Sequence, residues 1–187
     1  VVAVSMAATF TIDNDSYVYV PSDITKANSN LKIGNTSASM STDIDYAKKF
    51  VVLTVSGEVK SVGDPIPWSD DAGNKHGAVP VTIEIDKKAK DETIGLMLKK
   101  DDLFTFYVDS IYHNGQYYVW QHEPQFEIGE KTIVHISNSE YGPDGYKGNN
   151  FVVEIGKYGK YKVVDEKAYN EHHEKGKPLD KAFAETQ

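Results

Sequence analysis

The sequence LFTFYVDSIYHNGQYYVW, residues 103–120, carries a strong local structural signal. Two runs rich in aromatic and β-branched residues, Leu103–Tyr112 and Gln116–Trp120, lie on either side of HNGQ. Residues of these types favour strands. Asn114-Gly115 is typical of a two-residue hairpin turn, because both turn positions need positive φ. The stretch therefore predicts an antiparallel β-hairpin.

Similar strand patterns occupy most of the chain between residues 50 and 164. Phe50–Val62 alternates apolar and polar residues, and Gly57 within it predicts a bulge or bend. The next stretch, Gly63–Gly77, has Pro, Gly and Asp at turn positions and predicts a long loop. Further strands are expected at Val79–Asp86, Lys131–Ser137, Phe151–Ile155 and Lys160–Val164. These features predict an all-β, mainly antiparallel fold, either an OB-like barrel or a small sandwich.

The two ends of the chain differ from this central part. Asp13–Tyr46 is polar, with one short alternating run at Tyr17–Val20 and a turn of helix expected around Asp43–Lys49. After residue 166, helix formers replace β-branched residues, and Pro178 suits the first turn of a short terminal helix. The predicted organisation is a strand over residues 1–12, a polar lead-in over 13–49, a β-barrel domain over 50–166 and a helical tail over 167–187.

Four segments together resemble a known family: VVLTVSGEVKSVGDP (51–65), VPVTIEIDKKAK (79–90), FEIGEKTIVHIS (126–137) and GKYGKYKVVDEKAY (156–169). Their order resembles the netrin-like, OB-type barrel of tissue inhibitors of metalloproteinases, and looks closer still to small secreted archaeal and bacterial proteins of the same plan. The resemblance covers roughly residues 50–169 and implies a secreted barrel. The chain lacks the N-terminal cysteine through which the inhibitors bind metal, so protease inhibition is not implied.

Composition excludes several classes of function. The chain of 187 residues has no cysteine, which excludes disulfides, thiolate metal sites and cysteine nucleophiles. Its net charge is −8, and all 20 basic residues are lysine. Because arginine is the usual residue for bidentate phosphate recognition, we expect no nucleic acid partner. The sequons at Asn14 and Asn35 are candidate glycosylation sites and favour an extracellular location.

No motif in the sequence predicts catalysis. The serines lack a G-x-S-x-G context, and phosphate-binding glycine loops are absent. Calcium is the better candidate ion, because Asp70, Asp71 and Asn74 in WSDDAGN are closely spaced oxygen ligands, as are the side chains of residues 13–15 in DNDS. An acidic loop that serves solubility is the alternative in both places.

The six histidines offer a weaker metal prediction. We expect the adjacent pair His172 and His173 on a solvated helix face, with a copper or zinc ion as the alternative. His113 and His122 flank the hairpin, and alternation leaves the face of His135 undecided.

Aromatic residues gather on the predicted hairpin. They are Tyr107, Tyr112, Tyr117, Tyr118 and Trp120. Such a cluster either stabilises the hairpin through cross-strand pairs or forms a stacking platform for sugars. We favour the first interpretation, in which the aromatic pairs stabilise the hairpin.

The stretch VVAVSMAATFTI, residues 1–12, has two interpretations. SMA at residues 5–7 matches a signal-peptidase site, although no basic region precedes it. The alternation instead predicts a strand with one apolar face, made of Val2, Val4, Met6, Ala8, Phe10 and Ile12. The apolar run is too short for a membrane-spanning helix. We see no partner for this strand within the polar lead-in, and a free edge strand invites pairing with another chain.

These observations predict an extracellular, non-catalytic structural protein that self-assembles into a surface filament by N-terminal strand exchange, with itself as partner. The alternative is a secreted, monomeric, netrin-like binding module of unknown ligand with a calcium or copper site. An enzyme is the third choice.

Overall fold

The computed structural model describes residues 9–12, 15–20, 31–34, 44–89, 95–120, 122–145 and 148–187. Its strands are β1 (Thr9–Ile12), β2 (Asp15–Val20), β3 (Leu31–Gly34), β4 (Leu53–Val62), β5 (Ile66–Ser69), β6 (Lys75–Ala89), β7 (Leu103–His113), β8 (Gln116–Trp120), β9 (Lys131–Ser139), β10 (Asn150–Val153), β11 (Lys160–Val164), β12 (Lys167–Tyr169) and β13 (Lys177–Pro178). Its helices are α2 (Ile44–Ala47), the 3₁₀ turn η2 (Gly156–Gly159) and α3 (Leu179–Ala184).

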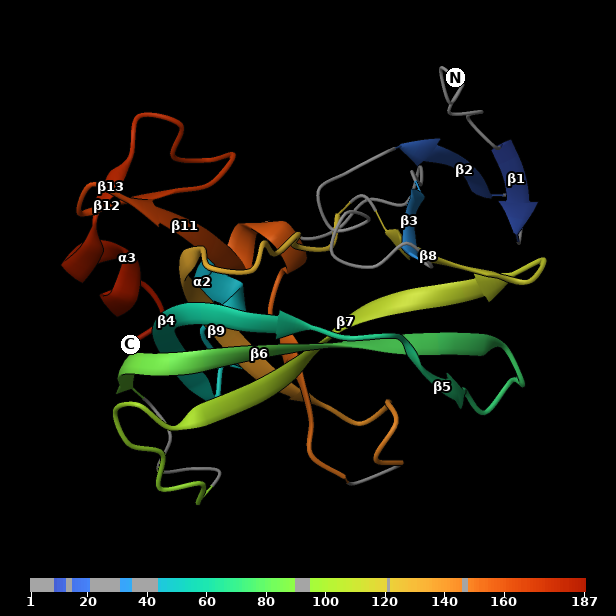
Figure 1. Cartoon of the computed structure of the whole chain (residues 1–187), viewed down its shortest axis with the longest axis horizontal. Helices are drawn as coiled ribbons and strands as arrows, with labels where there is room; N and C mark the ends of the chain where they lie inside the picture. The colour runs from blue at the N-terminus through green and yellow to red at the C-terminus, as the bar shows by residue number, and fades with distance from the viewer. Residues whose placement is uncertain are drawn as a thin grey trace.

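Five of the strands close into a ring. β4 pairs with β6 and β9, β6 pairs with β7, and β10 joins β7 to β9 (Figure 1). The order around the ring is β4–β6–β7–β10–β9, and only the β7–β10 junction is parallel. A five-stranded Greek-key ring of this kind is the OB-type barrel. The predicted all-β, mainly antiparallel, OB-like fold is therefore confirmed.

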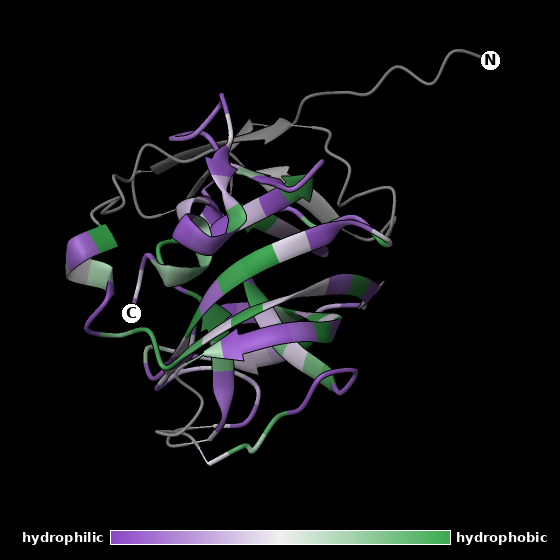
Figure 2. Cartoon of the chain, turned by 90° about the vertical axis from the view of Figure 1, so that its left-hand side faces the viewer, coloured by the Kyte–Doolittle hydropathy of each residue, from purple (hydrophilic) through white to green (hydrophobic). Residues whose placement is uncertain are grey.

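The barrel core follows from the period-two pattern of its strands, and Figure 2 shows hydrophobic and hydrophilic residues succeeding one another along them. In β6 and β7, cross-strand partners such as Val81 and Phe106 share the inner face and are fully buried. Phe126, from the connection between β8 and β9, packs edge-on against Phe106 with ring centroids 5.2 Å apart. This connection therefore contributes to the core as well as joining two strands.

Two local predictions from glycine are confirmed. The β7–β8 hairpin turns at Asn114 (φ 49°) and Gly115 (φ 81°), both in the left-handed region that the turn requires. The register between β4 and β6 shifts between Ser56 and Gly57, which is the expected bulge.

The prediction of a long loop over residues 63–77 is wrong. β5 pairs with the start of β6, from Ile66 opposite Ala78 to Ser69 opposite Lys75, so most of this stretch is a second hairpin. Its turn is held by Asp70, whose backbone N–H donates to the carbonyl of Asn74. Pro and Gly do not prevent this hairpin, because β5 is an edge strand that pairs with β6 alone among the described strands.

The lead-in adds strands to the β8 edge of the β7–β8 hairpin. β3 pairs in parallel with β8, β2 with β3, and β1 with β2. The pairing of Thr9–Ile12 with β2 corrects the expectation that the N-terminal strand has no partner in its own lead-in. In this part of the chain, residues 1–8, 13, 14, 21–30 and 35–43 lie outside the described residues, and with them Val2, Val4, Met6, Ala8, Asn14 and Asn35. The expected helical turn before residue 50 is confirmed as α2.

The tail contains the predicted terminal helix, but its first half is not helical. β12 and β13 form a short hairpin, and α3 follows Pro178 directly. A second, smaller core lies beneath α3, where Ala182 and Phe183 pack with Ile133 and Tyr161. No helix in the described part of the chain has the length and apolar character that crossing a membrane requires.

Candidate ligand-binding groove

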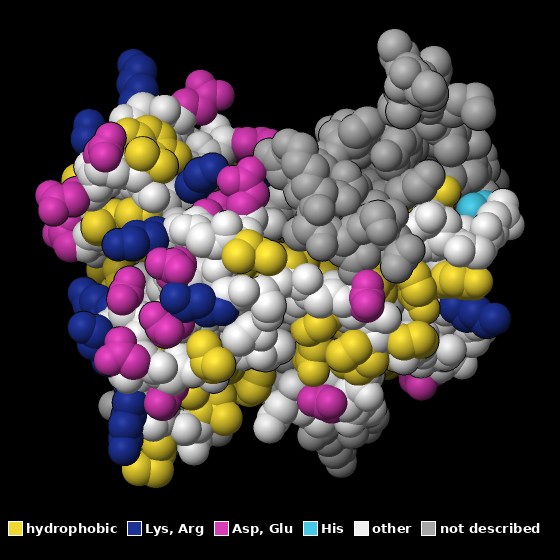
Figure 3. Space-filling view, in the orientation of Figure 1, with side chains coloured by type: hydrophobic (Ala, Val, Ile, Leu, Met, Phe, Trp, Pro, Cys, Tyr) yellow, Lys and Arg dark blue, Asp and Glu magenta, His cyan; other side chains and the backbone are white. Residues whose placement is uncertain are grey.

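A cavity of about 390 Å³ lies at the end of the ribbon formed by β5, β6, β7 and β8. Figure 1 shows the two hairpin turns of this ribbon reaching away from α3 and the C-terminus, and Figure 3 shows hydrophobic side chains exposed on this half of the molecule. The lining residues are Pro67, Trp68, Ser69, Lys75, Tyr112 and Tyr117. We call this cavity the hairpin groove.

Strand register explains why these residues meet. Ser69 is opposite Lys75 across β5–β6, and Tyr112 is opposite Tyr117 across β7–β8. His76 is opposite Ile111, so Lys75 and Tyr112 are the next neighbours across β6–β7. The four side chains form one row across four strands, because directly opposed residues share a face. The Lys75 Nζ lies 5.8 Å from the centroid of the Tyr112 ring, which agrees with this row.

Gly77 shapes the floor of the groove because glycine has no side chain. A Cβ at this position would lie 2.7 Å from the ring of Tyr117 and 2.6 Å from Ser110 Oγ. Glycine therefore lets the Tyr117 ring lie close to the sheet. The rings of Tyr112 and Tyr117 are 5.0 Å apart and tilted by 60°, so they form two walls at an angle.

The structure divides the aromatic cluster predicted from the sequence between two faces. Tyr112 and Tyr117 make the expected cross-strand pair and also line the groove. Tyr118 is buried, and Trp120 stacks with His122 at 6.0 Å on the opposite face. The stabilising and stacking interpretations are thus compatible for this tyrosine pair.

The opposite face of the ribbon carries a cluster of titratable groups. The His76 ring stacks on Trp68 with centroids 4.4 Å apart, and its Nε2 and Nδ1 lie 3.3 Å from Asp70 Oδ2 and 3.8 Å from Asp109 Oδ1. Burial raises the pKa of Asp109 to about 6, while His76 opposes the rise. Burial and the nearby Asp109 raise the pKa of Glu123 to about 8. Carboxyl groups here keep protons at pH values where exposed ones have lost them.

The predicted calcium ligands lie in the β5–β6 turn. Both carboxylate oxygens of Asp70 accept hydrogen bonds from Asn74, one from the backbone N–H and one from Nδ2, each at 2.8 Å. Asn74 therefore turns its amide donor toward Asp70, and Asp71 is exposed. In the second candidate stretch, residues 13 and 14 lie outside the described part of the chain. Calcium binding stays a prediction.

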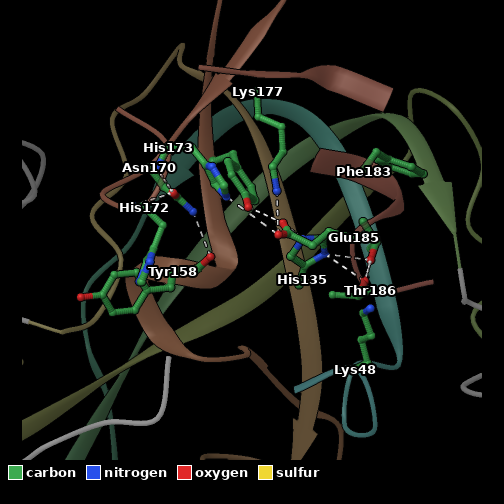
Figure 4. A network of polar contacts seen from close by, with 12 residues as sticks. Lys48, His135, Tyr158, Asn170, His172, His173, Lys177, Phe183, Glu185 and Thr186 are labelled. Carbon is green, nitrogen blue, oxygen red and sulfur yellow. Dashed lines mark hydrogen bonds and ion pairs between the residues drawn. The ribbon is translucent and has the colours of Figure 1, made fainter. Parts of the chain in front are cut away.

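A buried polar network fastens the tail to the barrel (Figure 4). His135 in β9 is fully buried, and its Nδ1 lies 3.0 Å from Thr54 Oγ1 and 3.2 Å from Thr186 Oγ1. The Glu185 carboxylate accepts hydrogen bonds from Tyr161 Oη and, at 2.7 Å, from Lys177 Nζ. Lys177 and the hydrogen bond from Tyr161 lower the pKa of Glu185 against the effect of burial. The network joins β4, β9, β11 and the chain end.

The two adjacent histidines do not lie on a helix, which corrects the prediction. His172 and His173 occupy the turn between β12 and β13 and contact different rings: His172 is edge-on to Tyr158 at 4.2 Å, and His173 stacks on Tyr161 at 5.9 Å. Both line a cavity of about 290 Å³ beside Glu185. Among the residues that the structure describes, no group of three or more His, Asp or Glu side chains is arranged to hold a metal ion.

A further cavity, of about 530 Å³, lies between α3 and the sheet. Its walls carry charges of both signs, including Lys87, Lys131, Asp86 and Asp180, over an apolar floor. Figure 3 shows the same mixture of basic and acidic side chains on this half of the molecule. Opposite charges compensate each other there, whereas the described lining of the hairpin groove has aromatic walls and one charged side chain. The hairpin groove is therefore the better candidate site.

Sequence reasoning identified the tyrosines of the groove but missed Lys75, Ser69 and Gly77. The missed residues lie in the stretch interpreted as a loop. The alternating IPWS before the turn and HGAV after it could have indicated paired strands, but only the pairing itself brings Lys75 beside Tyr112.

Comparison with protein family models, with curated proteins and with solved structures finds no match.

Proposed function

We propose that the protein is an extracellular, non-catalytic binding module that holds its ligand in the hairpin groove. The observation that carries the proposal is the row of Ser69, Lys75, Tyr112 and Tyr117 on one face of a four-stranded ribbon. A volume of about 390 Å³ lies within the range of small-ligand pockets. Aromatic side chains bind well at small entropic cost, because they have few rotatable bonds.

The fold supports the same region by analogy. OB-type barrels bind ligands on the face of their second and third strands and in the connection between the first and second. Here these elements are β6, β7 and the β5 hairpin, which build the groove. The extracellular location rests on the sequons and on the resemblance to secreted barrels.

Removal of one aromatic wall tests the proposal. We expect wild-type protein to retain ligands from an array of glycans and short peptides, and Tyr112→Ala to lose at least about tenfold in affinity, since a well-packed aromatic contact contributes on the order of 1.4 kcal/mol. Tyr112 is 36% exposed, so the variant should fold. Tyr141→Ala, at an exposed tyrosine in the β9–β10 connection, is the control and should bind normally. Equal binding by both variants would contradict the proposal.

Self-assembly by N-terminal strand exchange is the second candidate function. Among the described strands, β1 pairs with β2 alone and stands at the end of the sheet. An edge strand offers unpaired backbone groups to another chain. A head-to-tail contact through this edge would extend into a filament. Its inserted face would be Val2, Val4, Met6, Ala8, Phe10 and Ile12.

Two substitutions that introduce negative charge test the assembly. Met6→Asp with Phe10→Asp should abolish filaments in negative-stain micrographs and shift the protein to a monomer peak in size-exclusion chromatography, because unpaired charge in an apolar contact costs several kcal/mol. Ser5→Asp with Thr9→Asp on the other face is the matched control and should assemble. A wild-type protein that runs as a sharp monomer would rule out the filament and leave the binding module.

A further inference from the structure

We infer that the hairpin groove binds an acidic carbohydrate of the uronate type, with Lys75 pairing to its carboxylate. This inference rests on the proposed binding function and specifies its ligand.

Charge selects an anionic ligand. Among the described residues that line the groove, Lys75 is the only charged one, in a chain whose net charge is −8. Within the described part of the chain, no carboxylate lies at ion-pair distance from its Nζ, and the described contact of that group is with the Tyr112 ring. The nearby Asp70 is occupied by Asn74, and Asp109 lies with His76 on the opposite face. An incoming carboxylate would therefore meet an uncompensated ammonium group.

The two tyrosine rings select a ligand with flat apolar faces. Their separation of 5.0 Å and tilt of 60° leave an angled pair of walls above the sheet. The ring faces carry partial negative charge and attract C–H groups, which a sugar ring presents on its flat sides. The Tyr117 hydroxyl is protonated at neutral pH, as that of any tyrosine is, so it can donate a hydrogen bond to the ligand. Burial, and then Tyr112, raise its pKa further.

Polar groups at the rim suit hydroxyl groups of a sugar. Ser69 lies beside Lys75, and β5 is an edge strand whose outer side is not paired with any described strand. Its backbone groups and the Ser69 hydroxyl offer both donors and acceptors. A proline-rich peptide could use the tyrosines, but it would leave the Lys75 charge without a partner. A uronate uses the rings, the hydroxyl and the ammonium group together.

Titration with a matched pair of sugars tests the inference. The probes are tri-galacturonate and the neutral tri-galactose, measured by calorimetry on wild type, Lys75→Gln, Tyr112→Ala and the control Lys99→Gln, at an exposed lysine remote in sequence from the groove. We expect wild type and Lys99→Gln to prefer the acidic trimer about fivefold, in keeping with a solvent-exposed ion pair. Lys75→Gln should bind both trimers equally, and Tyr112→Ala should lose both. Added salt should reduce the preference of wild type.

The outcomes separate the inference from the proposed function. Equal binding of the two trimers by wild type, or an unchanged preference in Lys75→Gln, overturns the acidic-sugar inference, while loss of binding in Tyr112→Ala would still support the groove. Binding of a peptide but of neither sugar overturns the inference and keeps the binding module. If neither sugars nor peptides bind, both fail.

Discussion

Gly57→Ala is expected to lower the free energy of unfolding by about 3 kcal/mol, because the added methyl group overpacks the barrel wall. A Cβ at this position would lie 2.1 Å from the backbone oxygen of Glu84 and 3.3 Å from the Cα of Ile85. Both obstacles are backbone atoms of β6. β4 is paired on its two sides, with β6 and with β9, so it cannot move away without breaking a ladder.

Gly73→Ala is the matched control. Gly73 lies in the β5–β6 turn at φ 83°, and nothing would lie within 4 Å of its Cβ. This variant should cost only the strain of positive φ, about 1 kcal/mol. Urea unfolding followed by circular dichroism measures the stability of both variants. The dependence of the free energy of unfolding on urea concentration is expected to stay constant. A loss at Gly57 no larger than that at Gly73 would contradict the predicted clash between a Cβ at residue 57 and the backbone of β6.

Glu123→Gln is expected to stabilise the protein at pH 8 by on the order of 4 kcal/mol. Burial, with Asp109 nearby, raises the pKa of Glu123 from its ordinary 4.5 to about 8. Between these values the folded chain holds a proton that the unfolded chain has released. The free energy of unfolding of the wild type should therefore fall as pH rises from about 5 to 8. Gln keeps the shape of the protonated acid and removes this dependence.

The measurement is a series of urea unfolding curves from pH 4 to pH 8. Wild type and Glu123→Gln should have similar stability near pH 4 and diverge as pH rises. In the variant, the free energy of unfolding should still fall, by a smaller amount, between about pH 4 and 6, because the pKa of Asp109 is also raised, to about 6. Glu127→Gln is the control, since this side chain in the same connection is 44% exposed and pairs with Lys162. Parallel curves for wild type and Glu123→Gln would disprove the prediction.

The sequence alone determined the strands whose signals are local. In β7 and β8 the aromatic and β-branched runs and the Asn114-Gly115 turn act within a few residues, so hairpin, turn and register followed from the sequence. The bulge at Gly57 and the short helix after Pro178 were predicted for the same reason. Capping, turn geometry and alternation depend on neighbours in the chain, which a sequence displays directly.

Tertiary structure alone decided what depends on distant partners. β5 is a strand because β6 lies beside it, although its prolines are typical of a loop. The burial of His135 depends on Thr54 and Thr186, which lie 81 and 51 residues away in the chain. The groove exists because pairing across four strands sets Lys75 beside Tyr112 and because Gly77 leaves room for Tyr117. The alternation of residues in the sequence shows which side chains share a face of each strand. Which strand faces pack together is decided by closure of the barrel, because closure buries their apolar side chains.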